Sequence, residues 1–197
     1  MQFDITYKWT IYQPPATKSF EHFKKSLWEK MDALNDGKLD LNVSPVIVHG
    51  GKQYMLLFLD IEQLVNPSIF NIRNLYYAYS GRGIHVYLPY YTDYQDILQH
   101  RTEIIQMFKN TVVDIITTLK ITPFRFMGAY SDKHNVWLHP MTTENVDYAV
   151  SVAKVKPFDL MSKEQYYNKI LGFFSKLKYM KIKDFMKLYA KIREVLA

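Results

Sequence analysis

Alternating apolar and polar positions open the chain and predict a strand over residues 3–12. Apolar residues then recur at helical spacing over residues 19–34, and the Asn-Asp-Gly turn at 35–37 ends this predicted helix. Two apolar runs, at 46–49 and 54–59, flank a pair of glycines and predict a β-hairpin. We therefore expect hairpin strands and one helix in this first part of the chain.

The middle of the chain continues the mixture of strands and helices. Residues 75–79 and 84–88 predict two strands around a Ser-Gly-Arg-Gly connection, and residues 93–110 have the spacing of an amphipathic helix. The segment 111–118 is mostly β-branched and favours a strand, although periodicity alone also allows a longer helix. Two short apolar runs around a polar loop complete this part at residues 124–138.

The C-terminal part, residues 154–197, predicts two helices. Ser162 and Gln165 have the spacing of a capping box, and one apolar stripe runs through residues 181–196. Strands and helices are mixed along the chain and hairpins are prominent, which predicts an α+β fold with a largely antiparallel sheet and flanking helices. We expect a core over residues 1–153 and a basic helical tail packed on it or appended to it.

Composition narrows the class of protein. The chain has 197 residues, of which 48% are hydrophobic and 22% charged, so it is long enough for one domain and too apolar for disorder. It has no cysteine, which excludes disulfides, iron–sulfur clusters, cysteine zinc sites and thiol nucleophiles. No run of about 18 apolar residues predicts a membrane span, and the first residues lack the apolar segment of a secretory signal. We expect an intracellular protein without a membrane partner.

The positive charge is concentrated in the tail. Residues 154–197 carry ten lysines and one arginine against four acidic residues, a net charge of +7, which leaves −1 for the rest of the chain. Such asymmetry is typical of proteins that bind phosphate backbones or anionic membranes. A solvated lysine-rich helix face is the simpler alternative, and charge alone does not separate the two.

An apolar strand ends in two acids at Asp60 and Glu62. Residues i and i+2 of a strand point to the same face, so these carboxylates are expected side by side. Two carboxylates at that distance repel, and one pKa rises unless a cation lies between them. Oxygen ligands of this kind suit Mg²⁺ or Mn²⁺. The alternative is a strand end whose two acids are simply solvated.

A second motif, Ser-Gly-Arg-Gly-Ile-His, has the chemistry of an anion site. Gly81 and Gly83 would let backbone N–H groups approach a phosphate closely. Ser80 adds a hydroxyl, Arg82 a forked cation, and His85 a ring N–H on the following strand. An ordinary hairpin turn with a partly exposed histidine would have the same pattern.

Together the two motifs resemble the archaeo-eukaryotic primase superfamily, which contains primases and primase–polymerases. The first family motif is an apolar strand ending in two acids one residue apart, and the second is Ser-Gly-x-x-Gly-x-His or a shortened form. The third, an apolar pair followed by Asp, is matched by Val112-Val113-Asp114. Arg125, Lys133-His134-Asn135 and Pro140 keep the spacing of a later family segment, with Ser131 in place of a histidine and Asn135 in place of a glycine. The resemblance covers residues 54–140 and argues for a non-helical segment 111–118 that brings Asp114 beside the first two acids.

The resemblance implies a nucleotidyltransferase with an RRM-like sheet that joins NTPs or dNTPs on a DNA template by a two-metal mechanism. By this likeness, Mg²⁺ or Mn²⁺ would be held by Asp60, Glu62 and Asp114. The triphosphate would be held by Ser80, Gly81, Arg82, Gly83 and His85, with further contacts from Arg125 and Lys133. The zinc-binding insertion of cellular primase small subunits is absent, so the chain looks more like the minimal members.

The resemblance also names partners. Single-stranded template and primer are expected to bind lysines of the tail, namely Lys176, Lys178, Lys181, Lys183, Lys187 and Lys191. A helical accessory subunit or a helicase is a further partner by the same likeness, in a plasmid, viral or nucleoid replication context. A non-catalytic nucleic-acid-binding replication subunit with the same fold is the alternative. A rolling-circle initiator nuclease is disfavoured, because that class needs a His-x-His pair and only His85 is present. Nucleotide preference, and priming as against extension, stay open.

Overall fold

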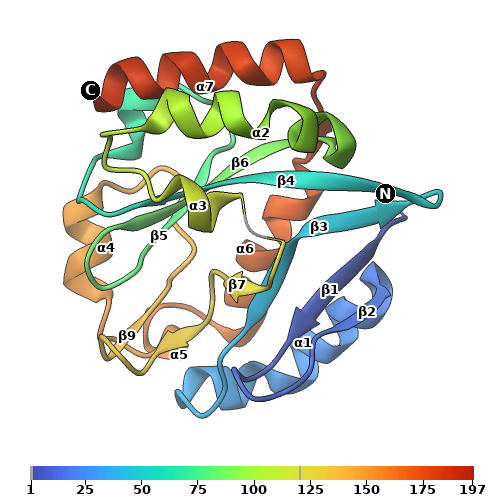
Figure 1. Ribbon diagram of the computed structural model, residues 1–197. Coiled ribbons are helices and arrows are strands. Elements are labelled where there is room, and N and C mark those ends of the chain that lie inside the picture. Colours follow the sequence, from blue (N-terminus) through green and yellow to red (C-terminus); the bar gives the residue numbers. More distant parts are fainter. Residues whose placement is uncertain (1, 120) are drawn as a thin grey trace.

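A central, mostly antiparallel sheet organises the protein in the computed structural model, which describes residues 2–119 and 121–197 (Figure 1). The strands are β1 (Asp4–Lys8), β2 (Ala16–Ser19), β3 (Asn42–His49), β4 (Lys52–Ile61), β5 (Tyr76–Tyr79), β6 (Ile84–Asp93), β7 (Phe124–Arg125), β8 (Tyr130–Ser131), β9 (Val136–Trp137) and β10 (Lys178–Tyr179). In the main sheet the order is β10-β6-β4-β3-β1-β2, with β5 beside β6 and β7 beside β3. β10 runs parallel to β6, and the other pairs are antiparallel. The expected α+β class and largely antiparallel sheet are confirmed.

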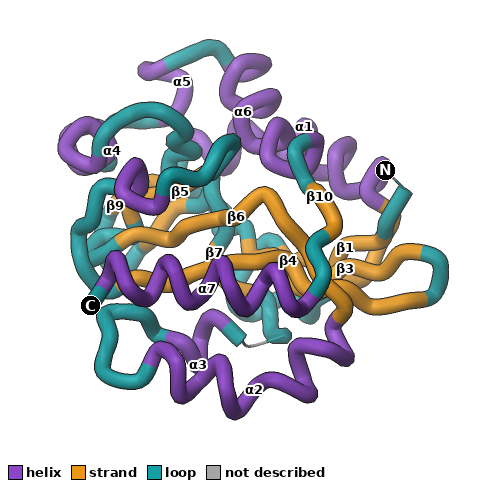
Figure 2. Tube along the Cα trace, turned by 90° about the horizontal axis from the view of Figure 1, so that it is seen from above, coloured by secondary structure: helices purple, strands orange, loops and turns teal. Residues whose placement is uncertain are grey.

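Helices cover both faces of the sheet. They are α1 (Phe20–Asn35), α2 (Tyr94–Phe108), α3 (Ile115–Thr118), α4 (Val146–Val152), α5 (Pro157–Leu160), α6 (Lys163–Ser175) and α7 (Ile182–Leu196), with a 3₁₀ turn η1 (Pro67–Phe70). α1 and α6 pack on one face, and α2 and α7 pack together on the other (Figures 1 and 2). No helix in the described ranges is long and apolar enough to cross a bilayer.

The two faces follow from the alternation of side chains along β4 and β6. Leu57 and Leu59 of β4 lie in the core beneath α2 and α7, whereas Phe58 between them lies in the core beneath α1 and α6. In β6, Val86 faces α7 and Tyr87 faces α6 in the same way. By this period of two, Asp60 and His85 belong to the α1/α6 face. These residues pair directly across the strands, so their side chains are neighbours.

Local capping residues fix the helix starts that the sequence predicted. Ser19 caps α1 by accepting a hydrogen bond from the N–H of His22 at 3.3 Å. Ser162 and Gln165 form the reciprocal capping box at the start of α6, as predicted. Each cap satisfies N–H groups that have no partner within the helix.

The tail helices are part of the same packed unit. α6 buries Tyr166 and Phe173 in the core beneath one face, and α7 buries Phe185, Tyr189 and Ile192 in the core beneath the other. An apolar side chain of this size contributes about 1.5–3 kcal/mol when it leaves water. Removing residues 154–197 would therefore uncover both faces of the sheet.

The segment 111–118 corrects one expectation. Its first half is extended, since Val113 forms an antiparallel bridge with Ile61, but its second half is the short helix α3. The N–H of Leu119 donates to the carbonyl of Ile115 at 3.0 Å, and both side chains are buried. This apolar burial overrides the strand propensity of the β-branched residues. The strand predicted over residues 3–12 is also wrong in part, because β1 ends at Lys8.

Candidate functional site

Three acids meet where β4 ends. Asp60 is the next-to-last residue of β4, and Glu62 directly follows the strand. The extended segment before α3 runs antiparallel to this strand end, and the N–H of Asp114 donates to the carbonyl of Asp60 at 2.8 Å. The N–H of Glu62 in turn donates to the carbonyl of Val112 at 2.8 Å. Because Ile61 and Val113 are partners in this bridge, Asp60 and Asp114 lie opposite each other.

The charges of these acids act on one another. Burial, together with the nearby charges of Asp114 and Glu62, raises the pKa of the Asp60 carboxyl to about 6. The guanidinium of Arg82 opposes this shift. A raised pKa with this cause marks a place where negative charge is in excess and a cation would stabilise the ionised carboxylates.

The Ser-Gly-Arg-Gly connection fits tightly against this strand end. The N–H of Ser80 donates to the carbonyl of Gly83 at 2.9 Å and closes the turn. A Cβ on Gly83 would lie 2.0 Å from the carbonyl oxygen of Ile61, so only glycine allows the turn to approach β4 this closely. Gly81 has a φ of +102°, and a Cβ there would lie 2.3 Å from the side chain of His134. The two glycines therefore hold the turn between β4 and the β8–β9 hairpin.

His85 lies beside Asp60 with little access to solvent. Its side chain is 13% exposed, and burial lowers its pKa to about 4. The ring is therefore neutral at pH 7, and the contact with Asp60 is not an ion pair. The Nε2 atom is 3.7 Å from the nearest Asp60 oxygen, which is longer than a hydrogen bond. A neutral imidazole in this position has an N–H that can donate to an oxygen of a ligand.

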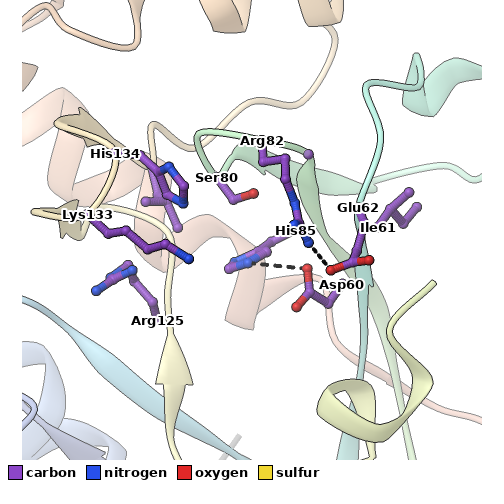
Figure 3. Close-up of a pocket in the computed structure, with 11 residues that line it drawn as sticks. Asp60, Ile61, Glu62, Ser80, Arg82, His85, Arg125, Lys133 and His134 are labelled. Atoms are coloured by element: carbon purple, nitrogen blue, oxygen red, sulfur yellow. Dashed lines mark hydrogen bonds and ion pairs between the residues drawn. The ribbon is translucent and has the colours of Figure 1, made fainter. Parts of the chain in front are cut away.

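Basic side chains approach from the opposite wall. Arg125 is on β7, where its Nε donates to Asp40 at 3.0 Å and its terminal nitrogen donates to Ser131 at 3.2 Å. Burial raises the pKa of the Asp40 carboxyl, and the charge of Arg125 acts against that shift. Lys133 and His134 come from the loop between β8 and β9 (Figure 3).

These walls enclose a pocket of about 240 Å³. It is lined by Asp60, Ile61, Glu62, Ser80, Arg82, Gly83, His85, Arg125, Lys133, His134 and Leu138. Figure 3 shows Asp60 and Glu62 on one side, with Lys133, His134 and Arg125 on the other. Arg82 reaches from the turn and forms an ion pair with Glu62. The pocket thus combines an acidic wall with a basic wall.

Most of the residues predicted for the site lie in this pocket. Gly81 shapes the turn without lining it, and Asp114 lies opposite Asp60 without lining it. His134 also lines the pocket, although the sequence did not predict a role for it. The sequence signals for His134 were its place next to Lys133 in a polar loop between two apolar runs, and the spacing that Lys133-His134-Asn135 shares with the later family segment.

The six predicted lysines lie elsewhere. Lys178 pairs with Tyr90 of β6, five residues beyond His85, which puts it roughly 16 Å along the strand from the pocket. Lys183, Lys187 and Lys191 are on α7, which covers the other face of the sheet. Lys176 and Lys181 lie at the ends of the α6–α7 connection. A nucleic-acid role for these residues stays a prediction.

The three acids at the end of β4 are of a kind that can bind a divalent cation. Among residues 2–119 and 121–197, no three acidic, histidine or cysteine side chains are grouped as they stand to hold a metal ion. Three carboxylates on adjoining segments nevertheless supply the oxygen ligands that Mg²⁺ and Mn²⁺ prefer. After burial, the charges of Asp114 and Glu62 are the next causes that raise the pKa of Asp60, so the three carboxylates are close enough to repel one another. Glu62, which Arg82 now neutralises, would have to exchange that partner for the cation.

Comparisons with known proteins identify no relative of the chain. No family model matches the chain, and neither curated proteins nor solved structures give a match. The motif residues and their positions around the pocket are therefore the evidence for function.

Proposed function

We propose that the chain is the catalytic core of a primase or primase–polymerase, which joins nucleoside triphosphates on a DNA template. One observation carries the proposal. Residues of three separate motif segments, together with Arg125 and Lys133, converge on one strand end and its pocket. Few reactions need an acidic wall and a basic wall so close together, and phosphoryl transfer from a nucleotide is one of them.

The basic wall would bind the triphosphate. Arg82 and Arg125 carry forked donors that match phosphate oxygens, and Ser80 adds a hydroxyl. Lys133 forms no ion pair within the described residues, so its charge is not already neutralised. His85, neutral and next to the acids, would donate its ring N–H to a phosphate oxygen between the two walls.

The acidic wall would hold the divalent cations through Asp60, Glu62 and Asp114. When bound, such cations activate the attacking hydroxyl and neutralise the charge that builds on the departing pyrophosphate. The chain itself fixes the acids through backbone hydrogen bonds between the end of β4 and the segment before α3. Arg82 would leave Glu62 for the triphosphate, since that ligand offers it a higher negative charge.

Two departures from the family pattern are compatible with the proposal. Asn135 stands where the family has glycine, and it adopts a left-handed φ of 54°, a conformation that asparagine tolerates better than most residues. Ser131 stands where the family has histidine, and it accepts a hydrogen bond from Arg125. Both positions therefore help to shape the basic wall.

A primer-synthesis assay tests the proposal. Labelled NTPs or dNTPs, Mn²⁺ and single-stranded DNA are supplied with and without an annealed primer. Wild type should form product, whereas Asp60→Ala and His85→Ala should lose it by at least about a hundredfold, as expected when groups that contact the reacting atoms are removed. Glu194→Ala is the matched control, because this exposed acid is on α7, on the other face of the sheet. A wild type that binds DNA without incorporating nucleotides on either template would favour the non-catalytic alternative.

A further inference from the structure

Arg125 is held on two sides before any ligand arrives. Its Nε donates to Asp40 at 3.0 Å, and its terminal nitrogen donates to Ser131 at 3.2 Å. The Asp40 side chain is 13% exposed and Ser131 is fully buried, so both acceptors are surrounded by protein and have little freedom to move. Arg125 nevertheless lines the pocket.

The backbone fixes both partners of this ion pair. The N–H of Asp40 donates to the carbonyl of Trp9 at 3.0 Å, and β7 pairs with β3 through Asn42 and Arg125. Phe124, which precedes Arg125, stacks on Phe58 of β4 with ring centroids 3.9 Å apart. Asp40 and Arg125 are therefore anchored to neighbouring strands, and the direction of the guanidinium is set by the fold.

We propose that Asp40 is a positioning residue, which orients Arg125 so that its remaining N–H groups meet the phosphate oxygens of a ligand in the pocket. The inference rests on the proposed function, since it assigns a polyphosphate to the basic wall. An arginine that is already ordered loses less side-chain freedom when it binds. Lys133 differs in kind, because it is exposed and has no ion-pair partner in the described part of the chain.

A purely structural role for Asp40 makes a different prediction. If the ion pair only attached β7 to β3, its loss would lower stability but leave the Kd of the folded protein unchanged. If Asp40 orients Arg125, its removal raises the Kd, and it does so only while Arg125 is present. The Kd of the folded protein therefore separates the two roles, and a double-mutant cycle shows whether Asp40 acts through Arg125.

The experiment measures the Kd of inorganic tripolyphosphate by calorimetry in the absence of metal. Asp40→Ala should raise the Kd about three- to tenfold and Arg125→Ala about tenfold or more, as expected for one charge-assisted hydrogen-bond donor. The double variant should bind no more weakly than Arg125→Ala. Asp40→Asn, which keeps an oxygen acceptor for Nε, should retain part of the affinity, and it replaces Asp40→Ala if that variant does not fold. Asp36→Ala is the control, because Asp36 is a nearby acid that pairs with Lys38 and Lys156 instead.

The possible results distinguish a failure of the role proposed for Asp40 from a failure of the proposed function. If wild type binds tripolyphosphate and Asp40→Ala and Asp40→Asn bind it equally well, Asp40 has no positioning role, and the proposed function is untouched. Additive losses in the double variant would also overturn the inference. If wild type does not bind tripolyphosphate, the basic wall does not hold a polyphosphate by itself and the inference is wrong, whereas the proposed function is decided separately by primer synthesis in the presence of Mn²⁺.

Discussion

Replacing Gly83 by alanine tests whether the close approach of the Ser-Gly-Arg-Gly turn to β4 shapes the pocket. An added Cβ would lie 2.0 Å from the carbonyl oxygen of Ile61 and 2.9 Å from the carbonyl carbon of Glu62. Both are backbone atoms, so no side chain can rotate away. The N–H of Glu62 is also tied to the carbonyl of Val112 at 2.8 Å. The turn and the strand end must therefore separate.

The cost of this separation can be estimated. Overpacking a well-packed site costs about 1–3 kcal/mol, and rigid backbone on one side of the contact favours the upper end. In a domain of this size each kcal/mol lowers Tm by about 2–4 °C, so we expect a loss of about 6–12 °C. The same shift moves Glu62 away from Arg82, and a displacement of about 1 Å in a site can cost up to a hundredfold in function. We expect the Kd for tripolyphosphate to rise at least about tenfold.

Thermal melting and calorimetry measure both effects, with Gly50→Ala as the control. Gly50 has a φ of +55°, and a Cβ there would meet nothing within 4 Å. That variant reports only the cost of a left-handed alanine, about 1–2 kcal/mol, and should keep wild-type binding. A Gly83→Ala protein that melts within about 2 °C of wild type and binds tripolyphosphate equally well would refute the steric reasoning.

Three further predictions follow from other parts of the molecule. Burial lowers the pKa of His139 to about 4 against 6.5 in an unfolded chain, so the unfolded state binds more protons between these values. Stability should therefore fall as pH drops from about 6.5 to 4, by about 3 kcal/mol, and urea titrations of His139→Gln should show a smaller fall. Lys133→Ala should raise the Kd for tripolyphosphate by about tenfold or more, with little change in Tm, because the side chain is exposed; an unchanged Kd would contradict its place in the basic wall. Neutralising Lys181, Lys183, Lys187 and Lys191 should weaken DNA binding and flatten its salt dependence, by a slope of up to about 3 on single strands; an unchanged slope would make the tail a solvated face.

The hairpins of the fold could be predicted because their signals are local. The Gly-Gly pair at 50–51 and the Ser-Gly-Arg-Gly turn at 80–83 separate apolar runs of strand length, and the structure forms β3–β4 and β5–β6 at these places. Alternation along β6 also predicted that His85 would face away from Ile84 and Val86, which lie in the other core. Period and turn chemistry are enough for such features.

Elements fixed by long-range packing could not be predicted in the same way. The parallel pairing of β10 with β6 joins residues 178–179 to residues 90–91, and no local pattern in either segment indicates that it pairs with the other. α3 forms because Ile115 and Leu119 are buried together, against the strand preference of their neighbours. In both cases the deciding contacts are made with residues far away in the sequence, which for Ile115 and Leu119 are those of the core beneath α2 and α7.

In the candidate site, too, local features could be predicted and long-range contacts could not. Strand period predicted Asp60 and Glu62 on one face, but Glu62 lies beyond the end of β4 and pairs with Arg82. That pair depends on how closely Gly83 approaches Ile61, which no local pattern reveals. His134 enters the pocket for a similar reason, since its side chain lies against the Cα of Gly81 on another loop.

Template-directed addition of a single nucleotide tests the central claim most directly. A primed DNA template with one defined unpaired base is incubated with each labelled nucleotide in turn, with Mg²⁺ or Mn²⁺, and the templating base is then changed. We predict that wild type extends the primer by the complementary nucleotide and that the preferred nucleotide changes with the template. Asp60→Asn should lose the product, whereas Glu194→Gln should keep it. Absence of product from wild type in both metals, or product that Asp60→Asn makes equally well, would contradict the assignment of this pocket to nucleotidyl transfer.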